Sequence, residues 1–248
     1  MRICLVSNAS VYTDAVLHSL LAYPEFEIAA LVKCTAVTGT ANDWPAYRRL
    51  LARSGILYAG YLGAVTKPRY RLPHLPNWRS MRVWSHSLSR PVLPTTDVSA
   101  PDTLNFIEHS QPDIILTAHL GQILRPAFYE RFAGKTVNIH PGKLPVFKGP
   151  DPVFHGLLEK EKSFSVSLHE SILEIDAGKV LAEKTISLKR RSLFRTNLEL
   201  FRSAGELMAS HFLGKNDCQP FADERPAAYH SWPTNGEVLK FLARGNRL

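Results

Sequence analysis

The hydrophobic and polar positions along this chain alternate between two periods, which predict strands and helices in turn. Unbroken apolar runs with β-branched residues are typical of buried parallel strands. Such runs occupy residues 2–7, 26–32 and 113–117, and residues 137–140 are expected to form a further short buried strand. Between them, apolar residues three and four positions apart predict helices at residues 11–21, 45–52 and 101–110, the last with Ser99 as a candidate N-cap. This order predicts an α/β fold, a Rossmann-like and mostly parallel sheet with helices on both faces.

The second half of the chain continues the alternation. Polar and apolar positions predict strands at residues 163–169 and 180–188, followed by a long amphipathic helix at residues 195–213 that Gly214 can cap. A short helix is expected at residues 237–243.

One stretch, residues 55–94, fits neither period and contains five prolines, which predict an irregular insertion. We therefore expect a main domain at residues 1–214 that includes this insertion. Residues 215–248 are expected to form a C-terminal extension.

Cysteine usage and hydropathy limit the setting of the protein. Cys4, Cys34 and Cys218 are odd in number and far apart, which fits neither a disulfide framework nor a metal site. No stretch approaches the roughly 20 apolar residues of a membrane span, and the apolar run at the N-terminus is too short for a signal peptide. We expect a soluble, cytoplasmic protein with no bound metal and no membrane contact.

The net charge of +8 is unevenly distributed. Between Trp44 and Thr96 the chain has nine basic residues and no acidic one. Such a stretch either forms a solvated basic face or attracts an anion such as a nucleotide diphosphate, a phosphopantetheine carrier or nucleic acid.

Candidate chemistry begins at Asn138 and His140, which leave the same face of a strand at its carboxyl end. Asp176 follows 36 positions after His140, close to Gly178, which can release the backbone into a turn. An amide, an imidazole and a carboxylate together suit acyl transfer, because they can stabilise an oxyanion and orient the imidazole. Taken separately, these motifs would be an ordinary strand end and an ordinary turn.

The sequence NIHPGKLPVFKG at residues 138–149, followed by IDAGKV at residues 175–180, resembles the formyltransferases that use 10-formyltetrahydrofolate. That family includes the glycinamide ribonucleotide, methionyl-tRNA and amino-sugar formyltransferases. The order of elements is similar over residues 1–213, and the similarity is sharp over residues 111–186. The resemblance implies that Asn138, His140 and Asp176 are catalytic.

The resemblance also implies which residues hold the folate. One wall would be Gln122, Ile123 and Leu124, and the opposing wall Ile172, Leu173, Glu174 and Ile175. Without the resemblance, Ile123 and Leu124 would be assigned to the core. His169 is expected to be structural, and His119 has no assigned role.

For the acceptor, the resemblance favours an amino sugar on a nucleotide carrier, with Lys148, Gly149, Pro150 and Asp151 as substrate-binding residues. Residues 7–12 lack the glycine-rich phosphate loop of the glycinamide ribonucleotide enzymes. The tail is too short for a separate tRNA-binding barrel, so nucleic acid is not expected.

Several alternatives stay open. The acceptor could be a small amine or hydroxylamine, or water could replace it in a formyltetrahydrofolate hydrolase. A catalytically silent folate-binding protein is a third reading. Gly142 and Lys143 replace the Ser-Leu more usual in this loop, which would place the Lys143 charge near the folate entrance. A homodimer is also left open.

Overall fold

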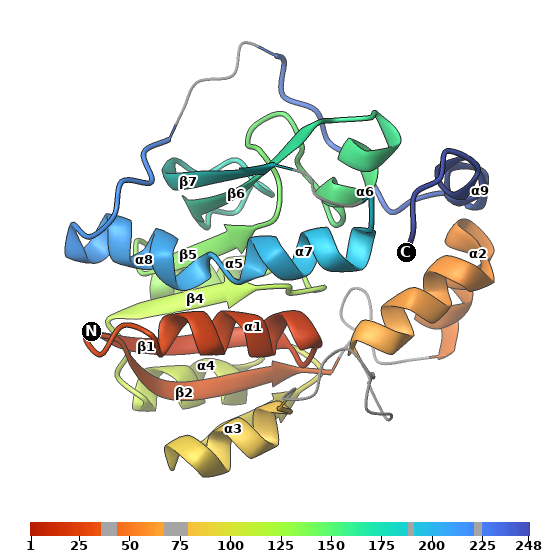
Figure 1. The fold of residues 1–248 in the computed structure, drawn as a ribbon. Coiled ribbons are helices and arrows are strands. Elements are labelled where there is room, and N and C mark those ends of the chain that lie inside the picture. The colour runs from red at the N-terminus through yellow and green to blue at the C-terminus, as the bar shows by residue number, and fades with distance from the viewer. Residues whose placement is uncertain (36–43, 67–78, 188–190, 221–224) are drawn as a thin grey trace.

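The computed structural model describes residues 1–35, 44–66, 79–187, 191–220 and 225–248. A seven-stranded sheet of order β3-β2-β1-β4-β5-β6-β7 forms its centre (Figure 1). The strands are β1 (Arg2–Asn8), β2 (Glu27–Cys34), β3 (Val92–Thr95), β4 (Ile114–Ala118), β5 (Thr136–His140), β6 (Ser163–Glu170) and β7 (Val180–Ser187).

Strand direction divides the sheet into two parts. From β3 to β5 every neighbouring pair is parallel, whereas β5, β6 and β7 pair antiparallel. The strands of the parallel part are rich in buried aliphatic residues, as expected for strands covered on both faces. The predicted Rossmann-like, mostly parallel sheet is confirmed.

Helices cover both faces of the sheet and enclose two separate hydrophobic cores. The larger core includes side chains of α1 (Val11–Leu20), α2 (Trp44–Thr66), α3 (Met81–Leu88), α6 (Pro152–Leu158), α7 (Leu193–Phe201), α8 (Ala204–Leu213) and α9 (Asn235–Ala243). The smaller core is formed with α4 (Pro101–His109) and α5 (Pro126–Phe132). We call these the front face and the rear face, since Figure 1 shows α1, α7 and α8 before the sheet and α4 behind it.

The irregular insertion predicted at residues 55–94 is wrong for the part that the structure describes. Helix α2 continues to Thr66 across a kink at Gly55, and α3 and β3 follow. Gly55 has a left-handed φ of 76° and lies against Asn235. Because this residue interrupts the helical pattern of the sequence, the second half of α2 was not predicted. Pro94 is tolerated because β3 is an edge strand. The prolines at 68, 73 and 76 lie outside the described residues.

The long helix predicted at residues 195–213 is also wrong, because α7 and α8 are two helices separated at Arg202 and Ser203. Gly205, at the start of α8, lies so close to the backbone of α1 that a Cβ there would be 2.0 Å from Ser19 O. The predicted cap at Gly214 is confirmed, with φ of 64°. Ser99 does not cap α4; its hydroxyl oxygen accepts a hydrogen bond from Arg125 N instead.

The C-terminal extension packs on the main fold. Val238 and Phe241 of α9 are fully buried in the front core. Ahead of α9, the tail pairs with the loop after β5, where Lys148 N donates to Ala228 O and His230 N donates to Lys148 O. Among the described residues, no helix has the length and hydropathy needed to cross a membrane.

Candidate active site

Asn138 and His140 lie at the carboxyl end of β5 and point toward the rear face. The alternate residues Val137 and Ile139 belong to the front core, so strand geometry sends Asn138 and His140 to the opposite side. The Asn138 amide is fixed at both ends. Its oxygen accepts from Thr117 Oγ1 at 2.9 Å, and its nitrogen lies 3.0 Å from His169 Nε2.

His169 on β6 determines how the Asn138 amide is used. His169 Nδ1 donates to Glu170 O at 2.7 Å, so Nε2 carries the lone pair that accepts from Asn138. Burial, with a smaller contribution from the charge of His140, lowers the pKa of His169 to about 4, which keeps the ring neutral near pH 7. An amide nitrogen has two N–H groups, and His169 takes only one. The other remains to bind a ligand oxygen.

Asp176 joins the two histidines. Its Oδ1 lies 3.6 Å from His140 Nδ1 and 3.7 Å from His169 Nε2. Its Oδ2 accepts from Gly149 N at 2.8 Å. His140 Nε2 donates to Phe147 O at 2.7 Å, which leaves Nδ1 facing the carboxylate. The structure thus gathers Asn138, His140 and Asp176, which the sequence placed together only by resemblance.

The turn at Asp176 differs from expectation in its details. Asp176 itself has the left-handed φ, 50°. Gly178 is required for close packing instead, because a Cβ there would lie 1.9 Å from Glu170 O. Gly142 is similarly confined, with Pro152 Cβ at 2.6 Å and His140 Nε2 at 2.8 Å from its would-be Cβ. Lys143 does not line the main pocket; it borders a separate small pocket.

A cavity of about 310 Å³ opens beside these residues, at the carboxyl edge of the parallel strands. Its walls come from both faces of the sheet. We call the rear chamber the part lined by Leu120, Ile123, Leu124, Tyr129, Ile172, Leu173 and Ile175. We call the front chamber the part lined by Tyr12, Tyr58, Tyr61, His119, Asp151, Asn197, Phe201 and Trp232.

The rear chamber contains most of the residues expected to hold a folate. Ile123 and Leu173, which line the cavity, are 61% and 60% exposed, an unusual exposure for large aliphatic side chains. Glu174 is the exception among the expected residues. It does not line the cavity, and its exposed carboxylate lies 3.8 Å from Lys148 Nζ.

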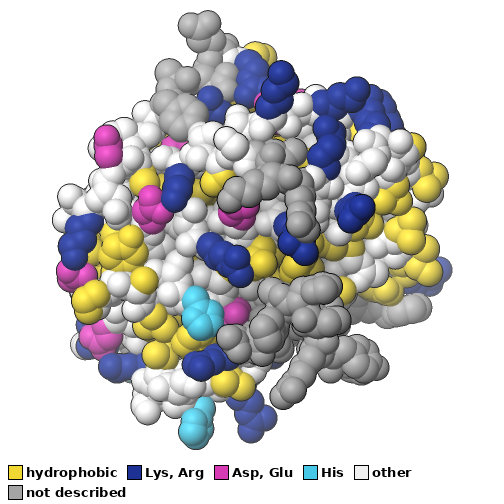
Figure 2. Space-filling view, in the orientation of Figure 1, with side chains coloured by type: hydrophobic (Ala, Val, Ile, Leu, Met, Phe, Trp, Pro, Cys, Tyr) yellow, Lys and Arg dark blue, Asp and Glu magenta, His cyan; other side chains and the backbone are white. Residues whose placement is uncertain are grey.

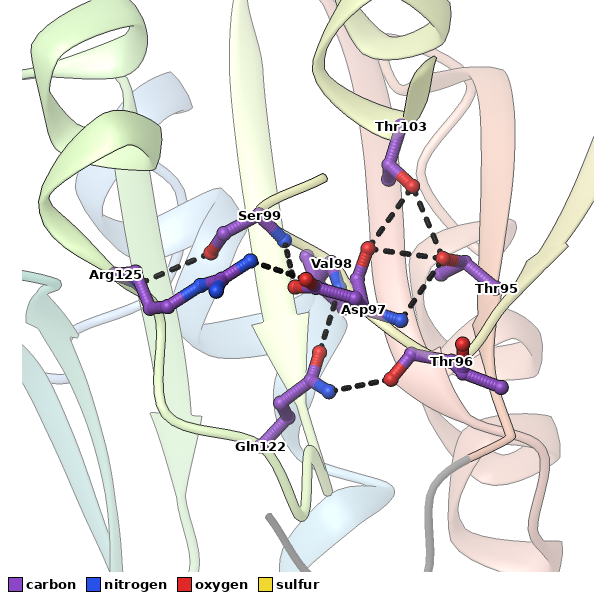
Figure 3. Close-up of polar contacts among 8 residues, drawn as sticks. All are labelled: Thr95, Thr96, Asp97, Val98, Ser99, Thr103, Gln122 and Arg125. Atoms are coloured by element: carbon purple, nitrogen blue, oxygen red, sulfur yellow. Dashed lines mark hydrogen bonds and ion pairs between the residues drawn. The ribbon is translucent and has the colours of Figure 1, made fainter. Parts of the chain in front are cut away.

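Gln122 uses its side chain to anchor the rear wall (Figure 3). Its amide nitrogen donates to Thr96 O at 2.7 Å, and its amide oxygen accepts from Val98 N at 2.6 Å. Three residues on, Arg125 forms an ion pair with Asp97 in the same loop. The segment that carries Ile123 and Leu124 is therefore tied on both sides to the loop after β3.

Most residues that line the front chamber were not predicted from the sequence. Gly149, Pro150 and Asp151 line the cavity as expected of substrate-binding residues, but Lys148 does not. Tyr58 and Tyr61 come from the part of α2 that the pattern did not reveal. Their spacing of three was the only signal, since it places both rings on one side of a helix.

Asp151 is buried in the wall of the front chamber. Its Oδ2 accepts from the Tyr58 hydroxyl at 2.6 Å, and its Oδ1 caps α6 by accepting from Phe154 N at 3.3 Å. Burial raises the pKa of Asp151 to about 6, although the bonds from Tyr58, Phe154 and Asn197 oppose this.

No Lys or Arg of the described residues lines this cavity. Basic residues of the stretch between Trp44 and Thr96 have other partners: Arg90 pairs with Glu27, Arg79 lies over Trp84, and Arg53 donates to Trp232 O. Lys67, Arg69 and Arg71 lie outside the described residues. Figure 2 shows Lys and Arg side chains spread over the visible face rather than gathered in a single patch.

The fold and the site together define an α/β protein with an acyl-transfer type of polar cluster beside a two-sided cavity. Residues 81–196 match the model of a protein family described as "Formyl transferase". This segment is therefore similar to the formyltransferases, and the resemblance seen in the sequence is confirmed.

Individual relatives agree with this family. Methionyl-tRNA formyltransferase of Borrelia turicatae (strain 91E135) is 29% identical over 101 residues, which cover 41% of this chain and 32% of the relative. The match thus spans about a third of that curated relative's length.

Solved structures of low sequence identity share the fold. Phosphoribosylglycinamide formyltransferase from Anaplasma phagocytophilum has a TM-score of 0.59 at 15% identity, over 93% of this chain and 98% of the other. A sugar N-formyltransferase from Shewanella sp FDAARGOS_354 has a TM-score of 0.56 at 14% identity, over 93% and 76% of the two chains.

Proposed function

We propose that this protein is an N-formyltransferase, which moves the formyl group of 10-formyltetrahydrofolate to a primary amine. One observation supports it most: Asn138, His140 and Asp176 meet at a single cavity, within the segment that matches the formyltransferase family.

The rear chamber suits the folate. Its lining is apolar on two opposing sides, from Ile123 and Leu124 on one and Ile172 and Leu173 on the other, which fits the faces of a flat ring. The backbone N–H and C=O groups of residues 120–124 can serve the polar edge, because the Gln122 side chain already fixes that segment. When bound there, 10-formyltetrahydrofolate supplies a formyl carbon bonded to nitrogen.

The polar residues have distinct parts in the transfer. The free N–H of Asn138 can donate to the oxygen that becomes negatively charged as the amine nitrogen bonds to the formyl carbon. His140 contributes charge rather than a direct hydrogen bond, because its Nε2–H is donated to Phe147 O and its Nδ1 faces Asp176. Asp176 stabilises that charge and receives the amine proton, directly or through a water. The transfer is complete when the bond from the formyl carbon to the folate nitrogen breaks and that nitrogen is protonated.

For the acceptor we favour an amino sugar on a nucleotide carrier. The absence of glycine from residues 7–12, which span the end of β1 and the start of α1, supports this, and the fold of a sugar N-formyltransferase is compatible with it. In this arrangement the amino ring enters the cavity, while the diphosphate stays outside its described lining.

The test is incubation with 10-formyltetrahydrofolate and a panel of amines: nucleotide-linked amino sugars, free amino sugars and hydroxylamine. Mass spectrometry should find a formylated amine with wild type and far less with Asp176→Asn. Formation of formate at the same rate with and without an amine would instead identify a hydrolase. Folate binding without any turnover would identify a silent binding protein.

A further inference from the structure

His119 occupies an unusual position at the end of β4. Its neighbours Leu116 and Ala118 face the front core, so regular alternation would turn His119 to the rear. A left-handed backbone, φ 47°, brings the ring to the front instead. There its centroid lies 5.0 Å from that of Tyr12 and 5.9 Å from that of Phe201. Strained backbone of this kind in a non-glycine residue tends to occur at functional sites.

The His119 imidazole makes no hydrogen bond within the described residues, and its Nδ1 is buried. Burial lowers the pKa of His119 to about 4, so the ring is neutral near pH 7 and has one donor and one acceptor nitrogen. Buried polar atoms in native proteins almost always have a partner, and an exception calls for an explanation. Nε2 is also unpaired among the residues that the structure describes but, unlike Nδ1, it is not fully buried, so it is the nitrogen that a ligand in the front chamber can reach.

His119 is also close to the reacting residues. Thr117 pairs with Asn138 and Ala118 pairs with Ile139 across β4 and β5. His119 is the first residue after β4, and His140 is the last residue of β5. A group bound beside His119 is therefore at the carboxyl ends of the same two strands as the catalytic amide.

The remaining walls of the front chamber combine flat rings with polar groups. The hydroxyls of Tyr12 and Tyr61 lie 2.7 Å apart, and that of Tyr58 donates to Asp151. Aromatic faces can pack against the C–H face of a saturated ring, while hydroxyl and carboxylate groups bind its substituents.

The charges of the lining residues limit which ligands can bind in the cavity. Among the described lining residues of the cavity, the carboxylates are Asp151 and Asp176, and no ammonium or guanidinium group balances them. A phosphate inside would be repelled by Asp151 in a poorly solvated space, and the positive charge proposed for His140 is already paired with Asp176. The bound part of the acceptor must therefore be neutral or cationic.

We infer that the front chamber is the acceptor subsite and selects a hydroxylated, phosphate-free ring that carries the amine, with His119 forming a hydrogen bond to that ring. This inference rests on the proposed N-formyltransferase function and adds the part of the acceptor that the enzyme recognises. Any nucleotide diphosphate on the acceptor lies outside the chamber and contributes separately.

The test uses methyl glycosides of aminodeoxyglucose with the amine at C2, C3 or C4, alongside the same rings linked to uridine diphosphate. Binding is measured by calorimetry with 5-formyltetrahydrofolate present, and turnover with 10-formyltetrahydrofolate. Wild type should bind and formylate at least one methyl glycoside. His119→Phe keeps the ring contacts with Tyr12 and Phe201 but removes both nitrogens. It should raise KM for that glycoside about tenfold, with a smaller effect on kcat.

Two further variants test whether the effect of His119→Phe comes from a lost hydrogen bond to the ligand or from a change in the protein structure. His119→Asn restores a polar side chain that tolerates a left-handed backbone, and should recover part of the lost affinity. His86→Phe makes the same exchange on the exposed surface of α3, outside the cavity, and should change nothing.

The inference is overturned if His119→Phe has wild-type KM, if no methyl glycoside binds to a folate-loaded enzyme, or if only open-chain amines such as putrescine are formylated. Absence of folate binding in wild type would instead contradict the proposed function.

Discussion

At the scale of single residues, Asp176 has the most consequential position. One carboxylate oxygen faces the imidazoles of His140 and His169, and the other holds the Gly149 backbone. Asp176 therefore connects β5, which carries Asn138 and His140, with the following loop, which lines the cavity at Gly149.

Asp176→Asn tests this position because it preserves the shape and one acceptor oxygen while removing the charge. The amide can still accept from Gly149 N, so the protein should stay folded. We expect kcat for formyl transfer to fall by about 10²-fold or more, as it does when charge-stabilising groups are removed. His140→Ala should cost a similar factor, and the double variant little more than either single one, since the pair acts as a unit. Additive losses would contradict the pairing.

Residues of the site differed in how well the sequence revealed them. The local pattern predicted that Asn138 and His140 share a strand face at a spacing of two, whereas Asp176 was placed beside them only by the resemblance. His169 and His119 were not recognisable as site residues. Their positions depend on pairing between β5 and β6 and on a left-handed backbone at the end of β4. Neither property can be read from spacing along the chain.

At the scale of elements, the loop after β4 and the loop after β5 form the two sides of the site. The loop after β4 is held by Gln122, which bonds to Thr96 O and Val98 N. Gln122→Leu leaves Val98 N and Thr96 O without their partner. The buried Val98 N–H costs about 1–3 kcal/mol, and the carbonyl of Thr96, an exposed residue, costs less. We expect the Kd for 5-formyltetrahydrofolate to rise about tenfold by calorimetry, because the rear wall loses its anchor.

Thr103→Val is the matched control for Gln122→Leu. Thr103 bonds to Thr95 and Asp97 in the same network but makes no contact with the rear-wall loop there (Figure 3). It should lower the free energy of unfolding by about 1 kcal/mol and leave folate affinity unchanged. Equal effects of the two variants on Kd would show that Gln122 only stabilises the fold.

The loop after β5 depends on Gly149. Its φ of 112° is unsuited to other residues, and a Cβ there would lie 2.0 Å from His230 O in the tail. Gly149→Ala should separate loop and tail, lower Tm by several degrees and raise KM for the acceptor. Gly134→Ala also meets a left-handed φ, 70°, but has no atom within 4 Å of the added Cβ. It should cost only about 1 kcal/mol of stability and leave KM unchanged. Matching effects on KM would rule out a role for the loop–tail contact in acceptor binding.

Most regular elements could be predicted because their patterns are local. Apart from β3, which lies in the stretch expected to be irregular, the strands of the sheet are continuous apolar or alternating runs, and Gly214 marks a helix end by its own chemistry. Tertiary packing decided the failures. The kink at Gly55 packs against Asn235, which lies far away in the sequence. The break between α7 and α8 lies next to Gly205, which packs closely on the backbone of α1. Partners this far away in sequence leave no local signal.

At the scale of the whole molecule, titration of buried groups links the site to stability. His119 and His169 both have a pKa near 4 in the folded chain, whereas an unfolded histidine has one near 6.5. Between pH 4 and 6.5 the unfolded chain binds more protons at these two residues, so their contribution to stability increases with pH. The pKa of Asp151 is raised to about 6, so between pH 3.8 and 6 the folded chain binds more protons at this residue, and its contribution to stability decreases as the pH rises.

Two histidines outweigh one carboxylate, so we expect the free energy of unfolding to fall by about 1 kcal/mol per pH unit as the pH is lowered from 6.5 to 4.5. His169→Gln should reduce this slope, because glutamine does not titrate. Urea unfolding at pH 5 and pH 7 measures it. An unchanged slope in His169→Gln would mean that His169 is not held neutral by its surroundings.

We propose that a folate on the rear face of the sheet and an amine on the front face meet at the end of β5. The most direct test is to follow the formyl carbon itself in a single turnover. 10-Formyltetrahydrofolate labelled with ¹³C in the formyl group is mixed with excess enzyme and an amino sugar, and the products are read by NMR. We predict that the label appears in an N-formyl group on the sugar with wild type and remains on the folate with Asp176→Asn. Label found only in formate would contradict formyl transfer to an amine and would identify a hydrolase.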